Sequence, residues 1–527
     1  MPDRIFRYEG AMPPPNFNMA RYCLRNAATS PSKPALIVAG SAGAAYPETW
    51  TYRALEEAVL RAAYLYRAER RLLAGSRILI RLHNTSAYPI AFFGAIAAGL
   101  VPAPVSPDLT ARELDFLLSD SEAAAMVFDD SLPHGDLPAA VEIITAKRFA
   151  EAIEGGVSGD FAETRCDDPA FLVYTSGTTA APKGVLHAQR SVWGRRPMYQ
   201  GWYGMEAADR LMHAGSFNWT YTLGTGLSDP WANGATSIVY TGEKDPSLWP
   251  RLMRDLDVTL FAAVPGVFRQ MLKYSADGSL DLARLRHGLC AGEALAPSVA
   301  EEWQDRTGTK LYEALGQTEL STYLSASPAF PPREGKCGRP QPGRCVVILA
   351  EEGGEAIRPV DNAGLIAVHR SDPGLMLGYW KRPDEEKDVF RGEWFAGGDL
   401  GTMDEDGYIT HLGRHNELMN AGGFRVSPLE VEQQLSQHPA VSEVAVTEIP
   451  LREGVSIIAA FVVARGGAEC DRAILRSHAK TCLAAYKQPR DYIFVSALPR
   501  TQNGKVKRGD LRASFHAGQR TEGNLHG

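Results

Sequence analysis

Along most of the chain, segments whose apolar residues recur at helical spacing alternate with short apolar runs of strand length. After Thr51, apolar residues recur at helical spacing, and Thr51 itself stands in the position of an N-cap. Apolar runs of strand length follow at 77–82, 124–128, 169–174 and 258–264. Strands that alternate with helical segments predict an α/β fold with layered, largely parallel sheets.

The pattern changes in the last part of the chain. Ser427, Pro428 and Glu430 combine an N-cap, a first-turn proline and the acid of a capping box, which predicts the start of a helix. One further helix and three strands are predicted in this part, at 472–485 and at 441–446, 457–463 and 492–495. This pattern is typical of a compact α+β unit.

The polar, glycine-containing segment 413–423 is the predicted linker between the two parts. A chain of 527 residues is also longer than one hydrophobic core usually serves. We therefore expect a large N-terminal domain of layered α/β sheets, residues 1–413, and a small, mobile α+β C-terminal domain, residues 414–527.

Composition excludes several classes of function. The formal net charge of −7 argues against a nucleic-acid partner, because such proteins usually carry a basic face. The longest uncharged stretch, 83–107, contains four prolines, which a membrane-spanning helix tolerates poorly. The seven cysteines are scattered and form no C-x-x-C pair, and the N-terminus has no apolar signal core. We expect a cytoplasmic protein with reduced thiols and no membrane partner, and the oligomeric state cannot be read from the sequence.

A hydroxyl-rich loop, 175–184, directly follows an apolar strand and contains Lys183. Backbone N–H groups and hydroxyls in such a loop can surround phosphate oxygens, while the lysine adds a positive charge. A solvated Ser/Thr turn is the alternative that composition alone favours. A Walker loop is excluded, since the loop ends in Pro-Lys-Gly instead of Gly-Lys-Ser/Thr.

The loop resembles the phosphate-binding loop of the adenylate-forming (AMP-binding) superfamily, which includes acyl-CoA and aryl-CoA ligases, firefly-type luciferases and peptide-synthetase adenylation domains. The family form is close to Y-T-S-G-T-T-G-x-P-K-G, and only Ala180 departs from it. Alanine reduces backbone freedom in a loop that must close over pyrophosphate. Further segments resemble the family's other motifs in the family's order, at 291–295, 312–319, 394–401, 413–417, 421–426 and 499–507.

The resemblance implies a nucleotide site with separate roles along ATP. Thr318 would touch the α-phosphate, Glu319 would hold Mg²⁺ as a metal ligand, and Asp399 would accept hydrogen bonds from the ribose hydroxyls. Arg414 would reach the ribose or a phosphate. The residues implied in ATP or AMP binding are Thr175, Ser176, Gly177, Thr178, Thr179, Lys183, Gly292, Glu293, Ala294, Tyr312, Asp399 and Arg414.

The motif at 499–507 resembles the one whose lysine catalyses adenylation, which here is Lys505. Its charge would bridge the carboxylate and the α-phosphate, two anions that repel each other. The implied catalytic residues are Lys505, Thr318 and Glu319. The implied cofactor and co-substrates are Mg²⁺, ATP and coenzyme A.

In the CoA ligases the small domain then rotates and forms a tunnel for CoA, a motion that the resemblance implies here. The implied hinge and CoA residues are Asn416, Gly422, Gly423, Phe424 and Arg425. Asn416 departs from the usual Asp or Lys, although Asn tolerates the backbone rotation.

Leu315 replaces the usual aromatic residue, so that dispersion replaces ring stacking on adenine.

The region that lines the acyl pocket in the family is uncharged here from 214 to 227. Asn218 stands close to where amino-acid-activating domains carry an Asp, so an amino-acid substrate is disfavoured. The aromatic residues of this region are equally consistent with ordinary core positions. The implied pocket residues are Phe217, Trp219, Tyr221, Gly224, Val264, Ala291 and Gly316. The segment is most like benzoate-CoA-ligase-type enzymes, which implies a small or medium aromatic, alicyclic or short-chain acid.

Two other functions remain open from the sequence. One is an adenylating enzyme that loads a carrier protein in trans, and the other is a non-catalytic relative that binds ATP or an acyl-adenylate. Retention of Lys505, Asp399, Arg414 and Glu319 argues against the second. Acylation of the Lys505 amine would stop adenylation, so a lysine acyltransferase or deacylase is a partner that the sequence allows.

Overall fold

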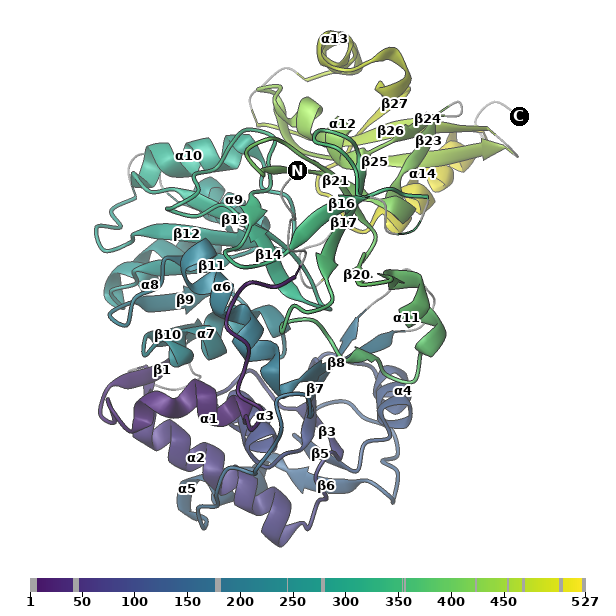
Figure 1. The fold of residues 1–527 in the computed structure, drawn as a ribbon. Coiled ribbons are helices and arrows are strands. Elements are labelled where there is room, and N and C mark those ends of the chain that lie inside the picture. Colours follow the sequence, from purple (N-terminus) through teal and green to yellow (C-terminus); the bar gives the residue numbers. More distant parts are fainter. Residues whose placement is uncertain are drawn as a thin grey trace.

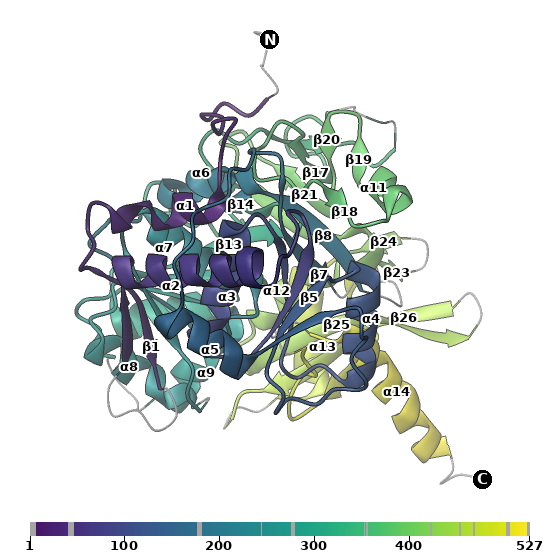
Figure 2. The same ribbon diagram turned by 90° about the horizontal axis from the view of Figure 1, so that it is seen from below.

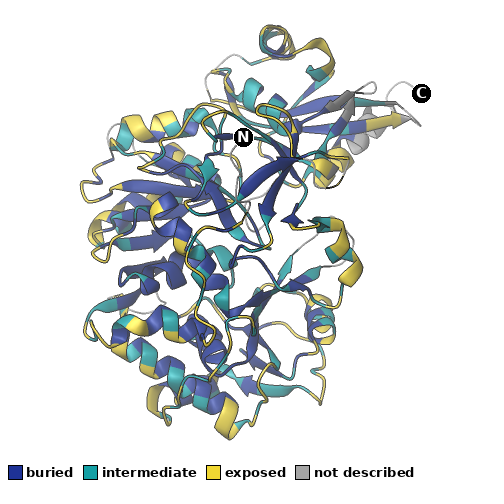
Figure 3. Cartoon of the chain, viewed as in Figure 1, coloured by how far each residue is buried: buried dark blue, intermediate teal, exposed yellow. Residues whose placement is uncertain are grey.

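The fold was analysed in a computed structural model of the chain. It describes residues 7–40, 47–175, 182–243, 245–275, 280–352, 354, 357–421, 424–452, 455–466, 470–501 and 506–523. Layered sheets and helices make up a large N-terminal domain, and a smaller C-terminal domain lies above them in Figure 1. The α/β class and the division into a large and a small domain are confirmed. Strands form the buried interior, whereas the outer faces of the helices are exposed (Figure 3).

The largest sheet has nine strands in the order β15-β14-β13-β12-β11-β9-β10-β1-β2. Strands β13, β12, β11, β9, β10 and β1 are parallel neighbours, while β14, β15 and β2 run antiparallel at the two edges. The strands are β1 Pro34–Ala39, β2 Glu48–Thr51, β9 Arg210–His213, β10 Thr236–Tyr240, β11 Leu260–Ala263, β12 His287–Ala291, β13 Leu311–Gln317, β14 Ser321–Ser325 and β15 Arg339–Pro340. Ligands of such sheets bind at the carboxyl ends of the parallel strands.

Helices cover one face of this sheet through a shared core. Side chains of the helices pack with Met212, Phe261 and Cys290 of the strands. These helices are α8 Trp249–Asp255, α9 Pro265–Tyr274 and α10 Pro297–Thr307. The opposite face packs against Trp202 and Tyr203, in a second core. The predicted strand 258–264 is β11, which is shorter because α9 begins at Pro265.

A four-stranded parallel sheet, ordered β4-β3-β5-β6, forms a second layer. Its strands are β3 Arg77–Arg81, β4 Val101–Pro104, β5 Ala125–Phe128 and β6 Glu142–Thr145, and its neighbouring helices are α1 Met19–Leu24, α2 Tyr52–Tyr64, α3 Ala87–Ala97, α4 Ala111–Ser121 and α5 Ala146–Gly155. Thr51 caps α2 by accepting a hydrogen bond from the Ala54 N–H, as predicted.

The long uncharged stretch forms α3 and β4. Helix α3 lies beside α2 (Figure 2) and is buried in the core of this layer. Its apolar composition on all sides therefore reflects burial in protein. Within the described ranges, no helix is both long and apolar enough to cross a membrane.

Two smaller sheets connect these layers to the site. The hairpin β7 Pro169–Thr175 and β8 Lys183–Ala188 pairs with β18 Gly378–Tyr379, and helix α11 Pro383–Val389 follows. The other sheet contains β16 Val346–Leu349, β17 Gly364–His369, β19 Phe390–Arg391, β20 Trp394–Phe395, β21 Asp399–Met403 and β22 Ile409–Arg414.

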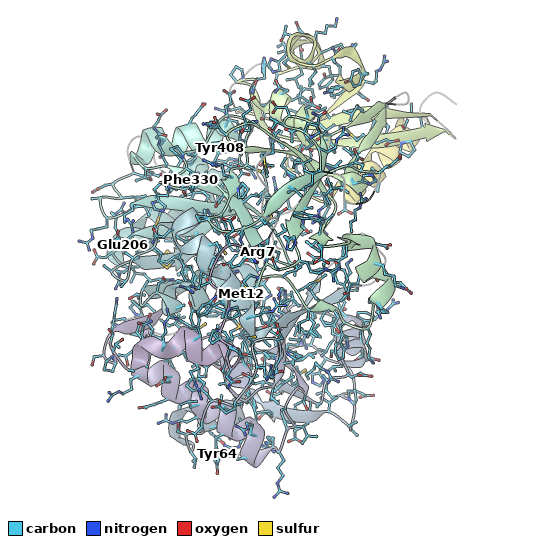
Figure 4. All side chains as sticks on the ribbon, in the orientation of Figure 1. Arg7, Met12, Tyr64, Glu206, Phe330 and Tyr408 are labelled. Carbon is cyan, nitrogen blue, oxygen red and sulfur yellow. The ribbon has the colours of Figure 1, made fainter. Side chains whose placement is uncertain are left out.

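Aromatic rings join this last sheet to the nine-stranded one. Arg339 of β15 lies over the rings of Phe330, at 4.8 Å, and Tyr408, at 5.5 Å. Figure 4 shows these two labelled side chains beside each other. The contact joins β15, at the edge of the nine-stranded sheet, to the residue that precedes β22.

The C-terminal domain contains β23 Met419–Ala421, β24 Phe424–Val426, α12 Pro428–Ser436, β25 Val441–Arg452, β26 Val455–Ala464, α13 Arg472–Cys482, β27 Asp491–Phe494 and α14 Arg508–Gly523. Ser427 caps α12 by accepting from the Glu430 N–H, while the Glu430 carboxylate pairs with Lys487. The β25–β26 hairpin extends beyond the two predicted strands, and α13 ends at Cys482, three residues before the predicted end.

The predicted linker is more regular than its composition indicates. Residues 413–414 end β22, a 3-10 turn spans His415–Glu417, and β23 pairs with β24. Hydrogen bonds between short strands therefore order a polar, glycine-containing segment. Gly422 and Gly423 lie outside the described residues.

Candidate active site

The phosphate-loop hairpin ends in a charge cluster around Lys183. Thr175 and Lys183 are paired at the end of the β7–β8 hairpin that carries the loop. Lys183 Nζ lies 3.2 Å from Glu385 Oε2 and 4.1 Å from the centre of the Tyr379 ring. The protein thus holds this ammonium group with one carboxylate and one aromatic face. The loop residues Ser176, Gly177, Thr178 and Thr179 lie outside the described residues.

Tyr379 connects this cluster to Glu319. Its hydroxyl donates a hydrogen bond to Glu319 Oε1 at 2.7 Å. Burial, and then the neighbouring Glu319 charge, raise the pKa of Tyr379, so the hydroxyl stays protonated and remains a donor. One tyrosine therefore contacts both Lys183 and Glu319, which the sequence places on different segments.

Asp399 is a buried carboxylate surrounded by donors. Gln317 Nε2 donates to Oδ2 at 2.6 Å, His411 Nε2 lies 3.2 Å from Oδ1, and Arg414 Nε lies 3.4 Å from Oδ1. Burial pushes the pKa of Asp399 upward, but the His411 hydrogen bond, the Arg414 charge and the Gln317 hydrogen bond outweigh it and hold the pKa below its usual value. The carboxylate is therefore anionic in the folded protein.

A glycine makes the Gln317 contact sterically possible. A Cβ atom at Gly397 would lie 1.8 Å from Gln317 Oε1, so any larger residue would displace this side chain. Gly397, two residues before Asp399, thus lets the loop that leads into β21 approach the end of β13 closely.

The tripeptide 317–319 connects the two clusters. It begins at Gln317, the last residue of β13, and Gln317 bonds to Asp399 while Glu319 bonds to Tyr379. Thr318 lies between them. The structure therefore brings together five predicted nucleotide residues, Lys183, Thr318, Glu319, Asp399 and Arg414.

The predicted adenine motif turns away from the end of β12. Gly292 has a φ of +97°, a left-handed conformation that favours glycine. Glu293 forms an ion pair with Arg500, and the Leu295 N–H donates to buried Glu313. Burial raises the pKa of Glu313 to about 7. Tyr312 lies edge-to-face with His287, with ring centres 4.9 Å apart, in the core of the sheet.

Three aromatic side chains meet at the end of β9. The ring centres of Tyr221 and His213 are 4.4 Å apart, and those of Trp219 and Tyr221 are 5.1 Å apart. Burial lowers the pKa of His213 to about 3, so its imidazole is neutral. Tyr221 packs against the core that contains Ala291, another predicted pocket residue.

Other predicted acyl-pocket residues have different neighbours. Phe217 is fully buried in the core of the α2–α3 layer, apart from the core that Tyr221 contacts. A Cβ at Gly224 would lie 2.6 Å from Arg195, so this glycine makes room for a guanidinium. Gly316 is similarly crowded by the backbone of Thr322. Val264, by contrast, lies 3.4 Å from the position of a Cβ at Gly292, beside the adenine motif.

The hinge and CoA residues are described only in part. Asn416 lies in the 3-10 turn after β22, and Phe424 and Arg425 lie in β24. Lys505, like Gly422 and Gly423, falls outside the described residues. Its neighbour Val506 forms an antiparallel bridge with Arg500.

Sequence reasoning missed four residues of the site. Gln317 could have been predicted from the sequence, because it stands between two residues of a quoted motif. Tyr379 and Glu385 lie outside every quoted motif, and only folding brings them to Lys183. His411 is three residues before Arg414, and a regular strand would place the two on opposite faces. A bulge at Leu412 shifts the register and lets both reach Asp399.

Comparisons with known proteins identify the family to which this chain belongs. The family model described as AMP-binding enzyme matches residues 23–380, and the model described as AMP-binding enzyme C-terminal domain matches 430–505. The chain belongs to the AMP-binding enzyme family. It is therefore an enzyme of the AMP-forming, adenylating type, as the resemblance indicated.

Several relatives of this family act on aromatic acids. The chain is 31% identical to benzoate–CoA ligase of Thauera aromatica, over 88% of this chain and 91% of the relative. The structure of a benzoate CoA ligase from Burkholderia xenovorans LB400 is 30% identical, with a TM-score of 0.82 over 94% of this chain and 100% of that one. An anthranilate CoA ligase in complex with anthranoyl-AMP is 25% identical, with a TM-score of 0.82 over 95% of this chain and 98% of that one.

Proposed function

We propose that this enzyme joins an aromatic carboxylic acid to coenzyme A in two steps, through an acyl-adenylate and with release of pyrophosphate and AMP. The observation that carries the proposal is the tripeptide 317–319, which links the Asp399 cluster to the Lys183 cluster. The resemblance assigns ribose, α-phosphate and outer phosphates to Asp399, Thr318 and Lys183. Their order in space is the order of these groups along ATP.

Each cluster suits its assigned part of the nucleotide. Asp399 is held as an anion, and a carboxylate has about four acceptor directions, so it can accept ribose hydroxyls as its protein donors adjust. Lys183 places a positive charge at the loop end of the β7–β8 hairpin, where pyrophosphate would leave. Arg414 neighbours Asp399 and can reach either the ribose or the α-phosphate.

The donor set also fits Mg²⁺. This ion usually binds through one or two carboxylates together with substrate phosphates. Tyr379 donates a hydrogen bond to Glu319 and so orients this carboxylate, which would hold the metal. When bound, Mg²⁺ would neutralise charge on the phosphates during pyrophosphate departure.

Lys505 is the proposed catalyst of the first step. The carboxylate of the substrate is already ionised at neutral pH, so no base has to remove a proton. What the step needs is a cation between two anions, and a lysine on the C-terminal domain can supply it. A rotation of that domain about Asn416 would then withdraw Lys505 and admit CoA.

An aromatic acid is supported by two independent features. The relatives and structural neighbours include ligases of benzoate, 3-hydroxybenzoate and anthranilate. Trp219, Tyr221 and neutral His213 form an uncharged aromatic cluster beside Ala291. Aromatic side chains are favourable neighbours for a substrate ring.

The proposal is tested by pyrophosphate release from ATP with a panel of aromatic, alicyclic, short-chain and amino acids, with and without CoA. We expect acid-dependent release, with acyl-CoA formed only when CoA is present and with aromatic acids preferred. Thioester formation only on a phosphopantetheinylated carrier protein would contradict the CoA assignment. If no acid in the panel caused pyrophosphate release although ATP still bound, the proposed catalytic activity would be contradicted.

The role of Lys505 has its own test. Lys505→Ala should abolish acid-dependent pyrophosphate exchange but leave thioester formation from added acyl-adenylate nearly unchanged, because the second step does not use this amine. Lys507→Ala, two residues away, is the matched control. Equal losses in both half-reactions would refute the assignment.

We also propose that acylation of Lys505 switches the enzyme off, through an acyltransferase and a deacylase that recognise the polar C-terminal segment. Loss of the positive charge would remove the adenylation catalyst. Mass spectrometry of the native protein should find a modified fraction with lower adenylation activity. A location in a reducing compartment such as the cytoplasm is supported by seven free cysteines, and cell fractionation would check it.

A further inference from the structure

Four charged side chains connect the two domains next to the predicted catalytic segment. Arg269 of α9 and Glu293 of the adenine motif belong to the N-terminal domain. Glu443 of β25 and Arg500 belong to the C-terminal domain. We call these four residues the interdomain bridge.

The bridge alternates in sign and crosses the domain boundary twice. Arg500 Nη1 lies 2.9 and 3.1 Å from the two carboxylate oxygens of Glu293. Its Nη2 donates to Glu443 Oε2 at 2.7 Å, and Arg269 Nη2 lies 3.1 Å from the same oxygen. Each domain therefore contributes one acid and one base, and each contact across the boundary joins opposite charges.

The four side chains are only 15–23% exposed. Partial burial reduces screening by water, so these contacts are stronger than ordinary surface ion pairs. Burial also lowers the pKa of Arg269 and raises that of Glu293, which shows that desolvation opposes the pairing. The attraction between opposite charges can thus hold the domains in one orientation. The cost of desolvating these charges offsets part of that attraction, so that the contacts can still separate.

Arg500 transmits this orientation to the segment that contains Lys505. Arg500 bridges Val506, and the Lys507 N–H donates to the Pro499 carbonyl at 2.8 Å. Lys505 is covalently joined to Val506, with successive Cα atoms about 3.8 Å apart. Whatever holds Arg500 against Glu293 therefore also restrains Val506, the residue that follows Lys505 in the sequence.

We propose that Arg269 and Glu293 are positioning residues, which hold the Arg500–Val506 pair against the nucleotide site for the adenylation step and must release it for thioester formation. The inference rests on the proposed two-step reaction. In the first step Lys505 must reach the α-phosphate, and misplacement by about 1 Å can cost 100-fold in rate. Rotation of the C-terminal domain separates both cross-boundary pairs while Glu443 and Arg500 move together.

Arg269 gives the cleanest test, because it belongs to no predicted nucleotide or catalytic motif. Arg269→Gln should slow adenylation by about 3- to 5-fold, the size expected for a partly buried ion pair. Arg269→Glu places like charges beside Glu443 and should slow it by at least about 10-fold. Thioester formation from added acyl-adenylate and CoA should stay at the wild-type rate in both variants, and Arg269→Lys should restore most of the adenylation rate.

Arg251→Gln is the matched control, since it breaks an ion pair of nearby α8 that stays within one helix. Its two half-reactions should both match wild type. If the Arg269 variants lower both half-reactions equally, or lower neither, the positioning role is wrong.

A second measurement does not depend on catalysis. Spin labels at Glu301 of α10 and Lys480 of α13, both exposed, would report the distance between the domains with ATP bound. Wild type and Arg251→Gln should give one main distance, and Arg269→Glu should broaden or shift it. Identical distributions would overturn the inference even if no acid substrate had been found, whereas inactivity of wild type alone would count only against the proposed function.

Discussion

The two ends of the proposed nucleotide site stabilise their charged groups in opposite ways. At Asp399, the protein surrounds an anion with three donors, so the charge is stabilised before any ligand arrives. At Lys183, the protein pairs a cation with Glu385, so the charge is neutralised by a group that phosphates would have to replace. We infer that the ribose end is preformed and that the phosphate end exchanges partners.

This difference has a physical reason in burial. Asp399 is 2% exposed, and an unpaired carboxylate at that depth would be very costly. Lys183 and Glu385 have side chains 22% and 33% exposed, so water can stabilise either one when they separate. A site that must release pyrophosphate benefits from contacts that exchange at low cost.

The largest effect is expected at Glu313, which supports the adenine motif and interacts electrostatically with His411 of the Asp399 cluster. Its pKa rises by burial from 4.5 to about 7 on folding, so its contribution to stability is complete below pH 4.5 and is lost as the pH rises through 7. At 1.36 kcal/mol per pKa unit this amounts to ~3 kcal/mol. Glu313→Gln cannot ionise and should gain stability relative to wild type by up to that amount between pH 4.5 and 8.5.

Urea unfolding of both proteins at the two pH values measures this effect. Glu301→Gln, at an exposed position of α10, should follow wild type. A Glu313→Gln difference that does not change with pH would mean that Glu313 is ionised in the folded protein, and the description of this end would have to be revised.

Asp399→Asn tests the preformed anion itself. It removes a charge-assisted acceptor of about 1.5–3 kcal/mol, so the Kd for ATP should rise about 10- to 100-fold. Isothermal titration with ATP measures this change. Asp406→Asn, which breaks an exposed ion pair with Arg333, serves as control. Wild-type affinity in Asp399→Asn would show that the ribose does not use this carboxylate.

Tyr379→Phe separates the two contacts of one side chain. The ring under Lys183 is kept, while Glu319 loses its hydroxyl donor. A hydrogen bond of about 1 kcal/mol predicts roughly a 5-fold rise in the Mg²⁺ concentration needed for half-maximal adenylation. ATP-dependent rates across a magnesium series would reveal it, and an unchanged midpoint would argue against Glu319 as the metal ligand.

Glu385→Gln should have the smallest effect and the opposite direction. Releasing Lys183 from its acid should tighten ATP binding, by about 2- to 5-fold, since partly exposed ion pairs contribute about 0–1 kcal/mol. Asp384→Asn removes the same charge from the neighbouring residue of α11, which pairs with Lys387 at the surface. If both variants change ATP affinity equally, general electrostatics explains the result and the exchange of partners does not.

Local interactions explain which parts of the fold were predictable. Thr51 and Ser427 cap their helices because an N-cap depends on a few neighbouring residues. The start of the β7–β8 hairpin and the order of the nucleotide motifs were also visible as short-range patterns. The extent of β25 and β26 was not, because pairing between them lengthens both strands.

Contacts between distant segments explain what was missed. Phe217 and Tyr221 were predicted to line one pocket, yet the two side chains pack in different hydrophobic cores. Gly224 looked like space for a substrate, but Arg195 fills it from a neighbouring segment. The spacing of residues in the sequence does not reveal which side chain from a distant segment contacts them in the folded protein.

The sequence by itself determined the fold class and the family, and it predicted the residue types of the proposed site: a hydroxyl-rich loop, carboxylates, an arginine and a lysine. Tertiary structure alone decided the partners of these groups. A bulge turned His411 toward Asp399, a short strand brought Tyr379 between Lys183 and Glu319, and domain packing set Arg500 against Glu293. Residue types can be read directly from the sequence. The charge state of each group depends on its burial and its neighbours, and distant segments bring those neighbours together only in the folded protein.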